Sequence, residues 1–236
     1  MKPDYARRYR TLWERHWWWR AREAMLLDRI DRLHRRGSRR PIRVLDVGCG
    51  DGLFFDRLER FGRVEGLEPD ASLVRDPRWR SRIRPEPLGD SFRGGADFDL
   101  VLMLDVLEHI EDDAAEMARA AEWLRPGGHV VALSPAHQWL FTPFDRAIGH
   151  YRRYTRKTLA ALTPPGLELV RLGYLDSVGL LASLGNRLLL GRSMPTPRQV
   201  ATWDTFMVPV SRVVDPALGF AVGKSVLGVW RHPAAV

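Results

Sequence analysis

The chain has 236 residues, a formal net charge of +8 and one cysteine. This length suffices for one well-packed α/β domain with an insertion and excludes two large domains. A hydrophobic content of 45% and a charged content of 28% exclude global disorder, and the single cysteine excludes an intramolecular disulfide, which favours a reducing cytoplasm.

Residues 1–40 hold the basic excess, because thirteen Lys or Arg face five Asp or Glu there and the remaining chain is balanced. Apolar residues at helical spacing predict one long helix or two shorter ones over residues 4–36. Residues 17–19 are all tryptophan, and at least one ring, which we take to be Trp18, should face a cleft, a partner or solvent. The polar start does not predict an export signal. No nucleic-acid motif accompanies the basic patch, which favours a solvated helix face over nucleic acid, an anionic membrane surface or an acidic substrate.

Residues 42–47 predict a strand that ends in a loop of alternating glycines, Gly48, Gly50 and Gly52. Glycine tolerates positive φ and lets a ligand approach the backbone closely. We expect the loop amides and the start of the following helix to receive a carboxylate or phosphate. The alternatives are a ligand-free turn and a nicotinamide site, although dinucleotide-binding loops have the spacing G-x-G-x-x-G rather than G-x-G-x-G.

The remaining chain alternates between predicted strands and helices. Further strands are expected at residues 64–68, 83–88, 98–104, 129–134, 167–175 and 225–230. Helices are expected at residues 53–60, 112–124, 155–162, 178–184, 188–190 and 206–214, and an irregular loop at residues 136–154. Residues 70–82 are expected to hold a short helix that is interrupted at Pro77. This alternation predicts a parallel sheet with helices on both faces. We divide the single domain into an N-terminal helical cap (1–40), a core (41–175), a helical lid insertion (176–223) and the last strand (224–236).

The glycine loop and the acidic residue before it resemble motif I of the class I methyltransferases that depend on S-adenosylmethionine (SAM). Residues 98–110 resemble the motif IV region of that family and residues 124–128 the turn after it, so the resemblance covers residues 42–135. It implies a Rossmann-like, seven-stranded, mostly parallel sheet, with SAM as cofactor and S-adenosylhomocysteine (SAH) as product. The cofactor-binding residues it implies are Asp46, Gly48, Cys49, Gly50, Gly52, Glu68, Pro69, Asp90, Ser91, Leu104 and Asp105.

Four of these residues are acidic and lie at or just beyond a predicted strand end, where parallel sheets bind ligands. The resemblance implies that Asp46 and the glycines hold the methionine end of the cofactor, and that Glu68 accepts hydrogen bonds from both ribose hydroxyls. Asp90 would accept from the adenine amino group, and Asp105 would lie beside the sulfonium. Cys49 is expected to be a small packing residue rather than a reactive thiol.

Residues 144–155, together with the cluster at residues 16–18, resemble a subgroup of bacterial small-molecule methyltransferases. We therefore expect an acceptor site after the fifth strand. The expected catalytic residues are His150, His109 and Asp145, with His150 as the proton acceptor. The expected substrate-binding residues are Trp18, His137, Arg152, Arg153 and Tyr154, although a solvated turn would also explain the two arginines.

Asp105, Glu108 and His109 would share one helical face if a helix began at Asp105. This set resembles the metal cluster of RNA 2′-O-methyltransferases and of some quinone O-methyltransferases, with His150 as a fourth ligand. The same Leu-Glu-His spelling is common in metal-free relatives, and we assign no metal.

The sequence thus predicts a cytoplasmic SAM-dependent methyltransferase that acts on a small molecule, at oxygen: a natural product, sugar, quinone or lipid-like acceptor. The alternatives are an RNA methyltransferase and a SAM-binding protein without turnover. Residues 179–190 are largely apolar but too short to span a bilayer, so they predict a buried lid helix, with peripheral membrane contact as the alternative. The oligomeric state does not follow from the sequence.

Overall fold

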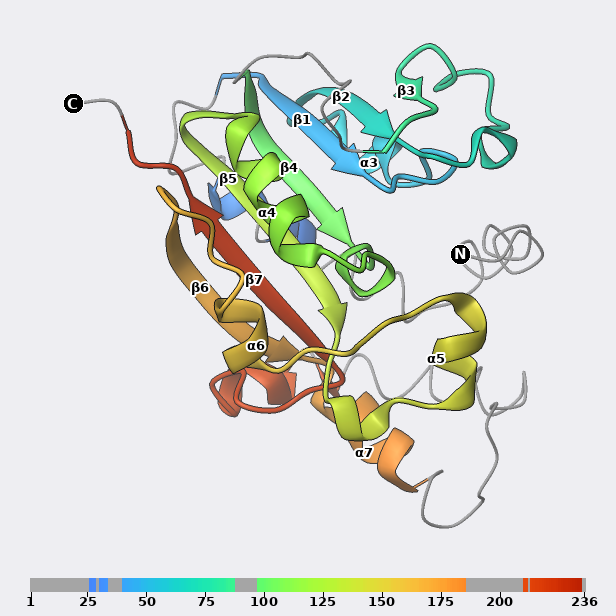
Figure 1. Ribbon diagram of the computed structural model, residues 1–236. Helices are drawn as coiled ribbons and strands as arrows, with labels where there is room; N and C mark the ends of the chain where they lie inside the picture. Colours follow the sequence, from blue (N-terminus) through green and yellow to red (C-terminus); the bar gives the residue numbers. More distant parts are fainter. Residues whose placement is uncertain are drawn as a thin grey trace.

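The structure, a computed structural model, describes residues 26–28, 30–33, 40–87, 97–185, 210–211 and 213–234. One seven-stranded sheet has the order β3-β2-β1-β4-β5-β7-β6 (Figure 1). The bounds are β1 Ile42–Val47, β2 Gly62–Leu67, β3 Ile83–Arg84, β4 Phe98–Leu104, β5 Leu124–Pro135, β6 Glu168–Leu175 and β7 Ser225–Arg231. Neighbouring strands from β3 to β5 run parallel, and β7 runs antiparallel to β5 and β6. The predicted seven-stranded, mostly parallel sheet is confirmed.

The sheet is buried on both faces, because neighbouring residues of one strand enter different apolar clusters. Leu45 of β1 packs with α4 (Asp113–Glu122) and α6 (Arg156–Ala160) on one face. Its neighbour Val44 packs with α3 (Phe55–Leu58) and with Leu26, Leu27 and Ile30 on the other face. Figure 1 shows α4 and α6 together on the same side of the sheet. The remainder of the predicted N-terminal cap lies outside the described residues.

Proline explains two differences from the predicted elements. Strand β3 has only two residues, since Pro85 follows it and has no N–H for the ladder. The predicted short helix over residues 70–82, interrupted at Pro77, is reduced to a single 3₁₀ turn, η1 (Ala71–Leu73), which is followed by turns. Pro77 disfavours helical backbone at the residue before it, which stops a helix there.

The predicted irregular loop at residues 136–154 contains two regular elements, η3 (Gln138–Leu140) and α5 (Pro143–Ile148). Helix α5 begins with a capping box, in which the Thr142 side chain accepts from the Asp145 amide and the Asp145 side chain accepts from the Thr142 amide. Figure 1 places α5 beyond the ends of β4 and β5, the edge at which parallel sheets bind ligands.

The insertion before β7 contributes α7 (Ser177–Gly185) and a helical stretch at residues 213–217. The fully buried Asp215 fastens the two together, because its carboxylate accepts from the amides of Asp176 (2.7 Å) and Ser177 (3.0 Å). The predicted helix at residues 188–190 lies outside the described residues, as does most of the one at residues 206–214. In the described part of the chain, no helix has the length and apolar character needed to cross a membrane. The boundaries of cap and lid stay predictions.

Candidate active site

The glycine loop after β1 adopts backbone conformations that side chains disfavour. Gly48, Gly50 and Gly52 have φ values of 66°, 56° and 70°, so the predicted need for glycine is confirmed. A Cβ at Gly48 would lie 2.7 Å from Val106 Cγ2, and one at Gly52 would lie 3.1 Å from Trp79 Cδ1. A Cβ at Gly50 would meet no atom within 4 Å. Gly50 is therefore the position where the backbone adjoins open space.

The loop amides are mostly engaged within the protein. The amides of Gly48 and Cys49 donate to the Leu67 carbonyl (2.8 and 3.1 Å), and that of Gly52 donates to the Cys49 carbonyl (3.0 Å). The Gly50 amide donates to the Glu68 carboxylate (3.0 Å). The amides of Gly48, Cys49 and Gly52 therefore donate to backbone carbonyls, while that of Gly50 receives a carboxylate of the chain itself. Binding of a ligand carboxylate or phosphate by this loop stays a prediction.

Two carboxyl groups lie side by side at this edge of the sheet. Asp46 is the last but one residue of β1 and has 4% of its surface exposed, and Glu68 follows β2 with 8% exposed. Burial raises the pKa of Asp46 to about 7, and the nearby Glu68 charge contributes. Burial also raises the pKa of Glu68, against hydrogen bonds from the amides of Asp70 and Gly50. A cationic ligand would lower the pKa of both groups again, since a nearby positive charge favours the ionised carboxylates.

The Glu68 carboxylate is held in place but keeps acceptor capacity. Its Oε2 accepts from Gly50 N–H (3.0 Å), and its Oε1 accepts from Asp70 N–H (2.9 Å). A carboxylate offers about four lone-pair sites, so one position on each oxygen remains for a further donor. A pair of neighbouring hydroxyls matches this arrangement.

Other predicted cofactor residues surround the same edge. Cys49 packs against β2, where a Cβ at Gly66 would meet its Sγ, and burial raises the pKa of the thiol, which agrees with a packing role. Leu104 is the last residue of β4, and Asp105 turns the chain with a φ of 56° while its amide donates to Leu133 (2.8 Å). Pro69 directly follows Glu68. Asp90 and Ser91 lie outside the described residues.

Contacts connect the glycine loop to the predicted catalytic residues. Val106 approaches Gly48 and precedes the 3₁₀ turn η2 (Leu107–His109). At the end of that turn, the His109 ring meets the His150 ring edge to face, with ring centroids 4.6 Å apart. The two predicted histidines therefore meet at the edge that also carries the glycine loop.

His150 is oriented by a buried carboxylate. Its Nδ1 lies 3.1 Å from Asp145 Oδ1, and Arg153 binds both oxygens of the same carboxylate (3.0 and 2.9 Å). Burial alone would raise the pKa of Asp145, but hydrogen bonds from His150, Arg153 and Thr142 outweigh it and hold this pKa below its usual range. An ionised carboxylate only accepts, so Nδ1 of His150 carries the proton and Nε2 offers its lone pair.

His109 has a different electrostatic setting. Its Nδ1 lies 3.2 Å from the Gly149 carbonyl, so that nitrogen donates and Nε2 is the acceptor. Burial, and secondarily the neighbouring His150, lower the pKa of His109 to about 4. The ring is neutral near pH 7 and is a weaker proton acceptor than an ordinary histidine.

The predicted substrate-binding residues mostly bond within the protein. Arg152 pairs with Asp113 (2.7 Å) and donates to the Glu111 carbonyl (2.8 Å). Tyr154 is 2% exposed and its hydroxyl donates to Asp113 (2.6 Å), while burial, followed by this hydrogen bond, raises its pKa. These contacts give both side chains structural tasks.

The side chain of His137 is more exposed to solvent than that of Tyr154. Its Nε2 lies 2.9 Å from the Gly223 carbonyl, which leaves Nδ1 as an acceptor, and its ring stacks on Tyr174. The exposed Trp139 lies beside it, with ring centroids 5.5 Å apart. Trp18 lies outside the described residues.

A group of metal-ligand type occurs within the described part of the chain. Glu108, His109 and His150 each offer one ligand atom, and these atoms lie within 4.8 Å of one another. Two imidazoles and a carboxylate suit Zn²⁺ or a related transition metal. Asp105 is not in this group, and its positive φ places it before η2 rather than on a helix, so the proposed shared helical face is wrong.

Sequence reasoning missed residues that support the site. Thr142-Pro143 followed by Asp145 is a capping-box pattern with proline at the first helical position, and it could have revealed α5. Trp79 packs against Gly52, but nothing in the local pattern marks it as a neighbour of that loop. Asp51 lies inside the glycine loop, but nothing in the local pattern marks its bonds to residues 75–76.

Comparisons with known proteins agree with this geometry. Residues 18–166 match the methyltransferase domain family. A ubiquinone biosynthesis O-methyltransferase of Methylobacterium sp. (strain 4-46) is 32% identical over 121 residues, which cover 46% of this chain and 49% of the relative. The chain thus spans about half the length of the curated relatives it matches, or less.

Solved structures share the fold at low sequence identity. The N-methyltransferase NodS from Bradyrhizobium japonicum WM9, solved in complex with SAH, is 18% identical with a TM-score of 0.58, covering 94% of this chain and 90% of NodS. A chain from the complex of the Haloferax volcanii Trm112 methyltransferase activator with a methyltransferase is 15% identical with a TM-score of 0.62, covering 99% of this chain and 96% of that chain.

Proposed function

Because the chain belongs to the SAM-dependent methyltransferase domain family, we propose that it transfers a methyl group to a hydroxyl oxygen of a small molecule. The observation that carries this proposal is the Asp145–His150 pair at the sheet edge that also carries the glycine loop, since an oxygen acceptor needs a base for its proton. The name of the Methylobacterium relative supports oxygen as the acceptor atom.

The residues at the edge of the sheet fit SAM. Gly50 supplies open backbone, Glu68 retains one acceptor position on each oxygen for a ribose diol, and Asp46 offers a buried carboxylate to a cation. When bound, SAM supplies a methyl group on a positively charged sulfur, which leaves as neutral sulfur in SAH. Asp46 would pair with a positive charge of the cofactor, and Glu68 would accept from its ribose hydroxyls.

In this proposal, Nε2 of His150 takes the hydroxyl proton of the small molecule that receives the methyl group. Asp145 and Arg153 fix the ring so that Nε2 faces away from the carboxylate, and Asp145 stabilises the imidazolium that forms. His109 is assigned a positioning task rather than proton transfer, because its pKa of about 4 makes it a poor base near pH 7. Arg153 and Tyr154 are reassigned from acceptor binding to support of the site.

The acceptor is proposed to be a small aromatic or quinone-like molecule that carries a hydroxyl group. Trp139, which lies beside His137, is 49% exposed, and Tyr151, which follows His150, is 53% exposed. Exposed aromatic rings bind flat apolar molecules well. The test is SAH release from SAM with a panel of phenols, sugars and lipid-like alcohols. SAH release with none of these, combined with methylation of RNA that weakens steeply with salt, would favour the RNA alternative. SAH binding with no turnover on any acceptor would favour the binding protein.

The pKa of Asp46 gives a prediction about pH. Between about pH 4 and pH 7 the folded protein keeps a proton on Asp46 that the unfolded chain releases, so stability falls as the pH rises through this window. Asp46→Asn removes that penalty and is expected to raise the free energy of unfolding at pH 8 by about 1–3 kcal/mol, with little effect at pH 4. The same variant should bind SAM more weakly, because a neutral amide does not pair with a cation.

Denaturant unfolding at pH 4 and pH 8 measures the stability effect, and calorimetry measures SAM binding. An equal change in unfolding free energy at both pH values would contradict the assigned ionisation of Asp46. Asp97→Asn, an exposed acid beside β4, is the matched control and should show neither effect.

A metal-assisted reaction is the second candidate, and the grouping of Glu108, His109 and His150 favours it. A base mechanism predicts that treatment with EDTA, followed by its removal, leaves the rate of methylation unchanged. Loss of the rate with EDTA and recovery with Zn²⁺ or Mg²⁺ would instead support the metal, because His150 as a ligand through Nε2 is no longer a base. Metal content measured on His109→Ala and on the unaltered protein distinguishes the base mechanism from the metal-assisted one.

A further inference from the structure

The segment after β2 is fastened to the glycine loop through Asp51. One oxygen of its carboxylate, Oδ1, accepts from the amides of Arg75 and Asp76, each at 2.8 Å. Asp51 is 7% exposed, so these charge-assisted hydrogen bonds are shielded from water. A residue of the loop thus determines where residues 75–76 lie, and they in turn restrain the loop.

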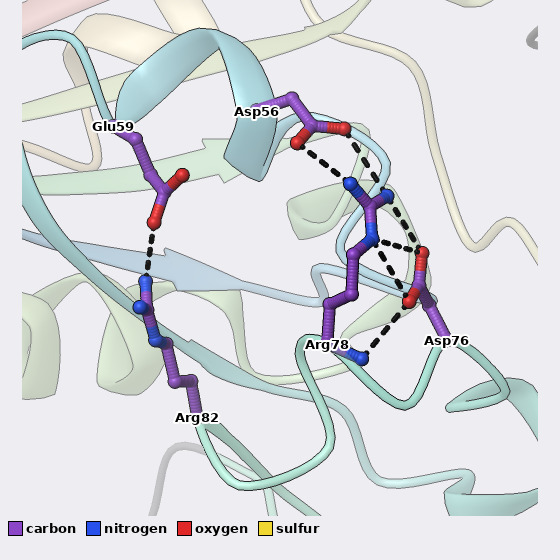
Figure 2. Close-up of polar contacts among 5 residues, drawn as sticks. All are labelled: Asp56, Glu59, Asp76, Arg78 and Arg82. Atoms are coloured by element: carbon purple, nitrogen blue, oxygen red, sulfur yellow. Dashed lines mark hydrogen bonds and ion pairs between the residues drawn. The ribbon is translucent and has the colours of Figure 1, made fainter.

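A second fastening joins the same segment to α3 (Figure 2). The Arg78 guanidinium binds both oxygens of Asp56 on α3 (3.1 and 3.3 Å) and also binds Asp76 (2.8 Å). Figure 2 shows Arg78 between the two carboxylates, and apart from them the pair formed by Arg82 of the same segment and Glu59, which follows α3. The arginine is more than half exposed, so its contribution is the weaker of the two fastenings.

Trp79 packs against the glycine loop and against α3. Its ring packs against Phe55 at a centroid distance of 5.5 Å, and a Cβ on Gly52 would meet it at 3.1 Å. Arg78 and Arg82 both lie over this ring. The loop is therefore confined between the sheet and residues 75–79.

Gly50 lies between the hydrogen bond to Glu68 and the hydrogen bonds of Asp51. On one side its amide donates to Glu68, and on the other side Asp51 is anchored to residues 75–76. We propose that Asp51 is a positioning residue for the cofactor: it keeps the open face of Gly50 and the Glu68 carboxylate in the geometry that binds SAM. This inference rests on the proposed function, and it requires no contact between Asp51 and the cofactor.

The test compares Asp51→Ala with Asp51→Asn and with Glu59→Ala. Glu59→Ala is the matched control, because it removes an acid that binds Arg82 of the same segment through a solvent-exposed pair. Loss of two shielded hydrogen bonds in Asp51→Ala is expected to raise the KM for SAM and the Kd for SAH by about tenfold or more. The kcat and the KM for the acceptor should stay within about twofold, since the chemistry at His150 is untouched.

The asparagine variant separates positioning from a general loss of stability. Its amide oxygen can accept from the same two amides, so Asp51→Asn is expected to recover most of the SAM affinity. Equal KM values for SAM in Asp51→Ala, Glu59→Ala and the unaltered protein would overturn the inference, as would a fall in kcat alone. If the unaltered protein itself fails to bind SAH by calorimetry, the proposed function fails instead, so the two failures are distinguishable.

Discussion

Replacing His150 with alanine is expected to lower kcat by about 10²- to 10⁴-fold, the usual contribution of a positioned general base. The physical reason is the loss of the Nε2 lone pair that Asp145 orients through Nδ1. The Kd for SAH should stay within about twofold, because no predicted cofactor contact involves this ring. Single-turnover methylation rates and calorimetry with SAH measure the two quantities.

Two controls accompany this variant. His232→Ala removes a half-buried histidine that directly follows β7, and it should leave kcat unchanged. Asp145→Asn keeps the shape of the carboxylate but weakens the orientation of His150 and the pairing with Arg153, so it should give an intermediate loss of kcat. Full activity of His150→Ala, in a protein that still binds SAH, would remove His150 from the mechanism.

Gly50→Val is expected to weaken SAH binding by at least about 100-fold, a loss typical of blocked close approach to a backbone. The new side chain would fill the open space beside Gly50 that we assign to the cofactor. It would also be strained at a φ of 56°, so the free energy of unfolding should fall by about 1–2 kcal/mol. Calorimetry gives the affinity, and denaturant unfolding gives the stability.

Gly166→Val separates strain from blocked binding. Gly166 has a φ of 84°, and a Cβ there would meet no atom within 4 Å. The stability loss should therefore be similar in the two variants, while SAH affinity changes only in Gly50→Val. Equal affinity in both variants would show that the space beside Gly50 is not used by the cofactor.

The sequence predicts the central sheet well because burial leaves a strong local signal. Strands β1 and β4 have the predicted bounds, since segments rich in apolar residues end there, just before Gly48 and Asp105. Asp46 and Glu68 are also predicted from the strand ends, because the carboxyl ends of the parallel strands β1 and β2 lie at one edge of the sheet. These residues could be grouped without any knowledge of side-chain contacts.

The second half of the site depends on long-range packing that local pattern does not encode. His109 and His150 meet only because η2 and the chain after α5 converge beyond β4, with the Tyr151 amide donating to the Glu108 carbonyl (2.8 Å). Asp145 is predicted as a catalytic residue, but its bonds to His150 and Arg153 depend on the fold of the loop after α5. The partners of Arg152 and Tyr154, both of which bind Asp113, are equally non-local.

The order of the strands has a consequence for synthesis on the ribosome. Strand β7 lies between β5 and β6, although it leaves the ribosome after both of them. Until residues 225–231 emerge, β5 has an open edge and β6 has no neighbour to pair with. Unpaired edges recruit other chains, so nascent protein that stalls within the preceding insertion would be prone to aggregate and would become a target for chaperones or proteases.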